Sequence, residues 1–272
     1  MSSNINFKTK TKMTYNCASD HYDDSPLSFW NYHSNKTIQY LHLQKGFTVL
    51  DLGCGSGASA IVSAKKVGNS GKVIGIDIAE KMLDLARKKA EDNNLVNIEF
   101  INRDMTNLDY FFDNQFDVVV CIFAIFFVEN MKRFLKEMWR LVKPGGKLSI
   151  TTWGPRMFEP AYSHWNNILK KYRPDILSSY NPWDKTNSTD SLGRLFEESN
   201  VTNVNIKEEM TYQPLSNPVD WWTIALGSGL RSVINQLSQD EYVKIKEANI
   251  DLIKKNKIKN IETNALYAIS KK

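Results

Sequence analysis

Between residues 47 and 153, short apolar runs alternate with stretches whose apolar residues recur every three or four positions. The runs predict buried strands, and the recurrences predict amphipathic helices. The predicted strands are 47–53, 71–77, 97–104, 116–127 and 147–153, and the predicted helices are 58–68, 79–94 and 130–146. Strands that alternate with helices form a parallel sheet with helices on both faces and right-handed crossovers.

The rhythm changes after Trp153. Residues 154–187 are rich in Pro, Trp and Tyr and predict loop and short helix. Further on, the pattern predicts a helix at 191–200, a strand at 203–215, two helices within 218–256 and a last strand at 263–272. We therefore expect a segment 1–46, a single domain 47–272, and insertions near 154–190 and 216–258. The first segment begins as a polar stretch that we expect to be frayed. We expect this segment and the insertions to cover the edge of the sheet where the ligand binds.

Charge, cysteine usage and hydropathy argue against several classes of protein and site. The formal net charge is +5, but the lysines are spread along the chain apart from a local excess in residues 252–260, so no nucleic-acid partner is expected. The three cysteines lie far apart without metal-ligand spacing, which predicts no metal site and a reducing cytoplasm. No apolar run reaches the ~20 residues of a membrane span, and the N-terminus lacks the apolar core of a secretory signal.

The stretch TVLDLGCGSGASA, residues 48–60, places three glycines directly behind the first strand. Their spacing is G-x-G-x-G, whereas dinucleotide sites use G-x-G-x-x-G, so an NAD site is disfavoured. A cofactor without phosphates needs a close, flat backbone beneath its ribose and its amino-acid part. The loop therefore predicts a nucleoside cofactor at the carboxyl ends of the strands.

Two acids follow at the next strand ends. Asp77 lies twenty residues after Gly57, where a carboxylate can accept hydrogen bonds from both ribose hydroxyls. An alternative role for Asp77 is to cap the following helix, and the two roles are compatible. Asp104 ends the third predicted strand and can accept a hydrogen bond from a purine amine, with Ile78 and Met105 against the ring faces.

The motifs VLDLGCGSG, VIGIDIAEKML, RDMTNL, FDVVVCIF and LVKPGG resemble, in order and spacing, those of class I S-adenosylmethionine-dependent methyltransferases. The likeness is to the small-molecule branch that includes ubiquinone/menaquinone-biosynthesis methyltransferases. It implies a Rossmann-like, seven-stranded, mostly parallel sheet with a helical and aromatic cap. The implied cofactor residues are Asp51, Gly53, Cys54, Gly55, Ser56, Asp77, Ile78, Met82, Asp104, Met105 and Cys121. Among them, Asp51 is expected to order the loop without touching the ligand, and the two cysteines can also be small buried hydrophobes.

Methyl transfer from a sulfonium needs positioning, and it needs a base only where the nucleophile must lose a proton. Candidate bases are His21 and His164, and Tyr22 or Phe123 is a candidate for cation–π contact with the sulfonium. His33, with the acids near it, is interpreted as loop charge or as a site for a cationic substrate. Trp221 and Trp222 lie about 100° apart on a helix and are not expected to face inward together.

The sequence thus predicts an enzyme that methylates a small or medium, partly hydrophobic acceptor, with oxygen slightly favoured as the target atom. The nucleic-acid amino-methyltransferase motif, Asn/Asp-Pro-Pro-aromatic, is missing after the fourth strand, as is the Asp-Asn pair of metal-dependent catechol enzymes. Two alternatives stay open. One is an RNA methyltransferase, and the other is a protein that binds the cofactor without turnover.

Overall fold

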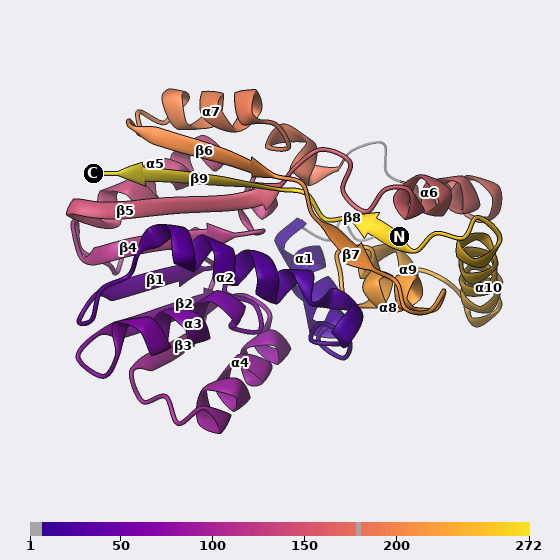
Figure 1. Cartoon of the computed structure of the whole chain (residues 1–272), viewed down its shortest axis with the longest axis horizontal. Coiled ribbons are helices and arrows are strands. Elements are labelled where there is room, and N and C mark those ends of the chain that lie inside the picture. The colour runs from indigo at the N-terminus through magenta and orange to yellow at the C-terminus, as the bar shows by residue number, and fades with distance from the viewer. Residues whose placement is uncertain (1–6, 178–180) are drawn as a thin grey trace. The chain divides into compact units, whose positions relative to one another are not determined.

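The computed structural model describes residues 7–177 and 181–272, and its largest element is a seven-stranded sheet (Figure 1). The strand order is β3-β2-β1-β4-β5-β9-β6. The strands are β1 (Thr48–Leu52), β2 (Lys72–Asp77), β3 (Ile98–Asn102), β4 (Phe116–Ile122), β5 (Val142–Trp153), β6 (Val204–Glu209) and β9 (Ala265–Lys271). The first five are parallel to one another, and β9 is antiparallel to both β5 and β6. The predicted mostly parallel, seven-stranded Rossmann-like fold is confirmed.

The most apolar strands occupy the centre of this sheet. β4 pairs with β1 on one side and β5 on the other, and its residues 118–121 are completely buried. A strand that is covered on both faces has to be apolar at every position rather than at alternate ones. Strand order also reverses between β1 and β4, so the carboxyl ends of these two strands mark the edge where such sheets bind ligands.

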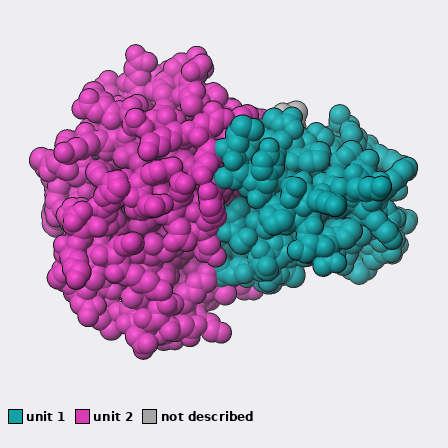
Figure 2. Space-filling view, viewed as in Figure 1, with its two compact units in different colours: residues 1–29, 156–181, 210–264 teal, residues 30–155, 182–209, 265–272 magenta. Residues whose placement is uncertain are grey.

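Five helices accompany the sheet strands: α2 (Phe29–Leu41), α3 (Ala58–Val67), α4 (Glu80–Asp92), α5 (Met131–Leu141) and α7 (Thr189–Glu198). α4 buries Met82, Leu83, Ala86 and Ala90, which is the face that the sequence predicts. α3 packs with α4, and α5 packs with α7. The chain folds into two compact units, and these strands and helices, apart from Phe29, lie in unit 2, residues 30–155, 182–209 and 265–272 (Figure 2).

Unit 1 comprises residues 1–29, 156–181 and 210–264. Its elements are α1 (Phe7–Ala18), α6 (Ala161–Tyr172), α8 (Asp220–Leu226), α9 (Arg231–Ile234), α10 (Gln239–Lys255), and the short pair β7 (Tyr212–Pro214) and β8 (Asn260–Glu262). Covering of the sheet edge by segment 1–46 and by the insertions near 154–190 and 216–258 stays a prediction. Residues 1–6 and 178–180 of those segments lie outside the described residues. No helix that the structure describes combines the length and apolarity needed to cross a bilayer.

Several predicted boundaries are wrong within the first half of the chain. The apolar run 116–127 is not one strand, because β4 ends at Ile122 and Phe123 takes a φ of 52°, after which residues 125–127 form a 3-10 turn. Val142 starts β5 instead of ending α5. From Phe7 onward, the expected frayed start is a helix, α1, which packs against α9. Tertiary contact supplies what the weak local pattern of α1 lacks.

Other differences concern residues beyond 153. The segment 154–187 contains a full three-turn helix, α6, rather than short helix. The expected strand 203–215 is divided: β6 joins the large sheet, and β7 pairs with β8 in a separate sheet. The region 218–256 forms three helices because Gly227 caps the end of α8 and Ser238 begins α10 with a capping box.

Candidate cofactor site

The glycine loop joins β1 to α3, and its three glycines share a left-handed backbone. Their φ angles are 73° at Gly53, 52° at Gly55 and 83° at Gly57, a region that side chains disfavour. The amides of Gly53 and Cys54 both donate to the carbonyl of Ile76 at 2.8 and 3.0 Å, which ties the loop to the end of β2. The G-x-G-x-G spacing is therefore required by the path of the chain.

The backbone of Gly53 also lies very close to residues of two other loops. A Cβ added there would lie 2.4 Å from the Cβ of Ala124 and 3.3 Å from the sulfur of Met105. Ala124 follows the end of β4, and Met105 follows β3. The tertiary structure thus brings the loops after β1, β3 and β4 together at Gly53.

Asp77 ends β2 and holds two backbone amides. One carboxylate oxygen accepts from the amide of Gly55 at 2.8 Å, and the other accepts from the amide of Ala79 at 2.8 Å. The second bond shapes the turn before α4, but the N-cap residue of α4 is Ala79 and no side chain caps this helix, so the expected capping role of Asp77 is wrong. Burial raises the pKa of this carboxyl, and the backbone amides oppose the shift. A carboxylate offers about four lone-pair positions, so two amides do not exhaust it.

Asp51 lies inside β1 and is completely buried. The Ser59 hydroxyl donates to its Oδ2 at 2.5 Å, while its Oδ1 has no hydrogen-bond partner among the described residues. Burial raises the pKa of Asp51 to about 7. Ser59 is in α3, so Asp51 joins the strand to the helix on either side of the glycine loop.

The other predicted contacts lie nearby in unit 2. Asp104 accepts from the amide and hydroxyl of Thr106 at 2.8 and 2.7 Å, which shapes the turn after β3. Ile78 is half-buried directly after β2, and Met82 is buried in α4. These positions place polar and apolar groups beside the glycine loop, and their roles toward a ligand stay predictions.

The two predicted cysteines are buried, and burial raises the pKa of both thiols above its usual value. Neither is a thiolate near neutral pH, so neither is activated as a nucleophile. Ser56 accepts from the ammonium of Lys89 at 2.9 Å. Sequence reasoning missed Lys89 because it reads as one more charge on the exposed face of α4.

The three candidate catalytic residues belong to unit 1, whereas the glycine loop belongs to unit 2. His21 pairs with Asp24 at 2.7 Å, and the ring of Tyr22 lies 6.3 Å from that of Tyr15. His164 is half-buried on α6. Their catalytic role stays a prediction.

His33 is not a loop charge, as the sequence suggested, but a completely buried residue of α2. Its Nδ1 lies 2.6 Å from the hydroxyl of Tyr267, which in turn donates to Glu209 at 3.0 Å. Because a carboxylate only accepts, the Tyr267 oxygen is left to accept from His33 Nδ1–H, which fixes the tautomer. The ring also packs edge-on against Phe123, just past the end of β4.

The expectation that Trp221 and Trp222 face apart is wrong. Both are buried, and both rings contact Trp165 of α6, at 6.4 and 5.9 Å between centroids. Their indole nitrogens donate to Asn249 and Tyr242 of α10. Within unit 1, α8 contacts both α6 and α10, so side chains on more than one face of α8 are buried.

Comparison with known proteins identifies the family. A family described as methyltransferase domain matches residues 49–146. A demethylmenaquinone methyltransferase of Listeria monocytogenes is 34% identical over 137 residues, which cover 50% of this chain and only 56% of that relative. A demethylmenaquinone methyltransferase of Bacillus velezensis is 31% identical over 181 residues, covering 62% of this chain and 77% of that relative. The chain belongs to the S-adenosylmethionine-dependent methyltransferases.

Solved structures place the methyltransferase fold in a wider group. Phosphoethanolamine N-methyltransferase 2 of Haemonchus contortus, solved with S-adenosylhomocysteine, aligns with a TM-score of 0.58 at 15% identity over 98% of this chain and 60% of its own. The cyclase SpnF aligns with a TM-score of 0.58 at 17% identity over 98% of this chain and 97% of its own. At these identities the likeness shows the fold alone, and one fold serves different reactions.

The methyl donor of the family, S-adenosylmethionine, fits the observed groups. The close contact of Gly53 with Ala124 leaves no room for a side chain, and the Asp77 carboxylate accepts from the amides of Gly55 and Ala79. One carboxylate oxygen of Asp51 is buried and has no hydrogen-bond partner among the residues that the structure describes. A cationic ligand compensates for buried carboxylates that would otherwise repel one another. The loop presents bare backbone, which suits a nucleoside without phosphates.

The raised pKa of Asp51 makes stability depend on pH. The folded protein holds this proton up to about pH 7, and the unfolded chain releases it near pH 4, so the contribution of Asp51 to stability falls as pH rises between these values. We expect Asp51→Asn to match the wild type near pH 4 and to be more stable by up to about 4 kcal/mol above pH 7. Urea unfolding of both proteins across this range measures the difference. A difference that does not change with pH contradicts the assignment.

Proposed function

We propose that this chain transfers a methyl group from S-adenosylmethionine to a small or medium, partly hydrophobic acceptor. The observation that carries the proposal is the fixed glycine loop, in which Asp77 binds the amide of Gly55 and Gly53 meets the end of β4. This arrangement supports a ligand at the carboxyl ends of β1, β2 and β4, on the edge where parallel sheets bind cofactors.

The chain's own residues act by positioning. When bound, S-adenosylmethionine supplies an activated methyl group on a sulfonium. Asp77 would accept hydrogen bonds from the ribose, Asp104 and Met105 would hold the adenine, and the glycine loop would support the amino-acid part. Fixing donor and acceptor in line contributes several kcal/mol of barrier reduction without a catalytic acid or base.

The acceptor is proposed from the relatives. The curated relatives are named for demethylmenaquinone, which favours a quinone-class acceptor with an aromatic ring. If the target is a phenolic hydroxyl, a base must take its proton, and His21 and His164 are the proposed candidates, while Tyr22 is proposed for cation–π contact with the sulfonium. In a reduced quinone, the methyl group can go to a hydroxyl oxygen on the ring or to a ring carbon. The sequence slightly favours oxygen.

The decisive experiment uses S-adenosylmethionine with an isotopically labelled methyl group. The protein is incubated with a metabolite extract, with a reduced demethylmenaquinone analogue and, separately, with total RNA. We expect the label in a hydrophobic small molecule, detected by mass spectrometry, and strongly reduced transfer by Asp77→Ala at donor concentrations near the wild-type Kd. Label in RNA alone would make the chain an RNA methyltransferase. Calorimetric binding of the cofactor with no labelled product from any source would make it a binding protein without turnover.

A further inference from the structure

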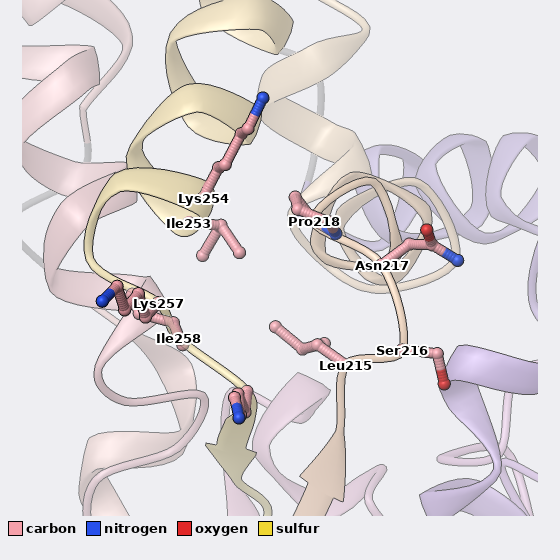
Figure 3. A pocket seen from close by; sticks show the side chains of 9 residues that line it. Leu215, Ser216, Asn217, Pro218, Ile253, Lys254, Lys257 and Ile258 are labelled. Carbon is pink, nitrogen blue, oxygen red and sulfur yellow. The ribbon is translucent and has the colours of Figure 1, made fainter.

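Unit 1 contains a hollow of about 390 Å³ that plays no part in the proposed cofactor site (Figure 3). Two segments line it, residues 215–218 before α8 and the end of α10 with the residues that follow it. Its volume lies within the range of small-ligand pockets, about 300–1,000 Å³. All its lining residues belong to unit 1.

The floor of this hollow is apolar. Leu215 and Ile253 are buried, with 8% and 2% of their surface exposed, and Ile258 is half-buried. Figure 3 shows Leu215 and Ile253 facing the hollow from opposite sides, with Pro218 on a third side. Leu215 and Ile253 close the floor, while the half-buried Ile258 and Pro218 are the apolar residues of the lining that water reaches, and they favour an occupant that itself carries apolar groups.

The rim is cationic. Lys254, Lys257 and Lys259 line the hollow, and Lys255 adjoins them, so four lysines fall within six residues. Figure 3 shows the ammonium groups of Lys254 and Lys257 directed outward from the floor. No acidic residue lines the hollow, and the described chain gives none of these four lysines an ion-pair partner.

The dipole of α10 explains the presence of only two of these four lysines. Cations in a last helical turn stabilise the negative end of the helix dipole, which accounts for Lys254 and Lys255. Lys257 and Lys259 lie beyond the last turn of the helix, where the effect of the dipole fades. At the other end of the same helix, Glu241 is paired with Arg173 at 2.9 Å.

We propose that this hollow docks the protein on an anionic phospholipid surface, with the lysines on the phosphate groups and the half-buried Ile258 and Pro218 toward the acyl region. Long lysine side chains suit this task because their stems lie on apolar surface while the charge reaches the headgroups. Each lysine close to an anionic bilayer strengthens binding about fivefold, or by about 1 kcal/mol of binding free energy, so the lysines of this cluster together contribute several kcal/mol. A free phosphate would use the rim alone and would leave the floor without a function. Docking would bring the enzyme to hydrophobic acceptors, but it does not depend on the proposed methyl transfer.

The test is co-sedimentation of the full chain with vesicles. We expect binding to phosphatidylcholine vesicles that contain phosphatidylglycerol, little binding to pure phosphatidylcholine, and weakening as salt rises from about 0.1 M to about 0.5 M. The variant Lys254→Gln/Lys257→Gln/Lys259→Gln should bind about a hundredfold more weakly. The matched control Lys88→Gln/Lys132→Gln/Lys136→Gln removes the same charge from exposed lysines of α4 and α5, and it should bind within about twofold of the wild type.

A second variant tests the apolar part of the lining without changing the charge of the protein. Ile258→Ser should reduce vesicle binding severalfold, with an unchanged unfolding temperature. Equal loss in the two lysine triples would mean that only net charge matters, and wild-type binding by the hollow triple would overturn the proposal. Full displacement from vesicles by inorganic phosphate, at matched ionic strength and equal total phosphate, would make the hollow a soluble-anion site instead. Cofactor binding, measured on the same proteins by calorimetry, should not change in any variant.

Discussion

Replacing Asp77 with alanine is expected to weaken S-adenosylmethionine binding about a hundredfold, because two charge-assisted hydrogen bonds to the ribose are each worth roughly 1.5 kcal/mol or more. The change also frees the amides of Gly55 and Ala79, which the carboxylate holds at 2.8 Å. Titration calorimetry with S-adenosylmethionine and with S-adenosylhomocysteine gives the affinity.

Two further variants separate ligand contact from loop support. Asp77→Asn keeps the shape and one acceptor oxygen, so it should lie between alanine and the wild type. Asp84→Ala removes an exposed acid of α4, which pairs with Arg87 at 3.0 Å, and should leave affinity unchanged. Wild-type affinity in Asp77→Ala would mean that the adenosine part binds elsewhere, and the assignment of the glycine loop would then fail.

Gly53→Ala should nearly abolish cofactor binding and destabilise the fold by about 2–4 kcal/mol. The added methyl would lie 2.4 Å from the Cβ of Ala124, and overpacking of this kind costs about 1–3 kcal/mol. The φ of 73° adds about 1 kcal/mol for any residue with a side chain. Urea unfolding and calorimetry measure the two effects on one preparation.

Gly145→Ala is the matched control for this substitution. Gly145 has a φ of 80°, nearly the angle of Gly53, but nothing lies within 4 Å of an added Cβ. It should lose only about 1 kcal/mol and bind the cofactor normally. If the two variants lose equal stability and both keep the cofactor, the close approach at Gly53 is not part of the site.

The sequence by itself determined the sheet and the place of the cofactor loop. Hydrophobic periodicity is a local property, so α4 and the strands β1 to β5 could be predicted from neighbouring residues. The G-x-G-x-G spacing was also informative, because left-handed backbone at Gly53, Gly55 and Gly57 restricts those positions to glycine. Asp77 follows from the same logic, since a strand end fixes the position of its last side chain.

Only the tertiary structure decided which polar groups are buried and what they touch. His33 and Tyr267 are 234 positions apart in the chain, and nothing local shows that they share a hydrogen bond. The raised pKa of Asp51 depends on atoms supplied by distant segments. Trp221 and Trp222 are both buried because α6 and α10 pack around α8, whereas a helix seen alone allows one inward face. Burial and long-range contact are properties of the assembled fold, and the one-dimensional pattern records them only where a whole face of an element is covered.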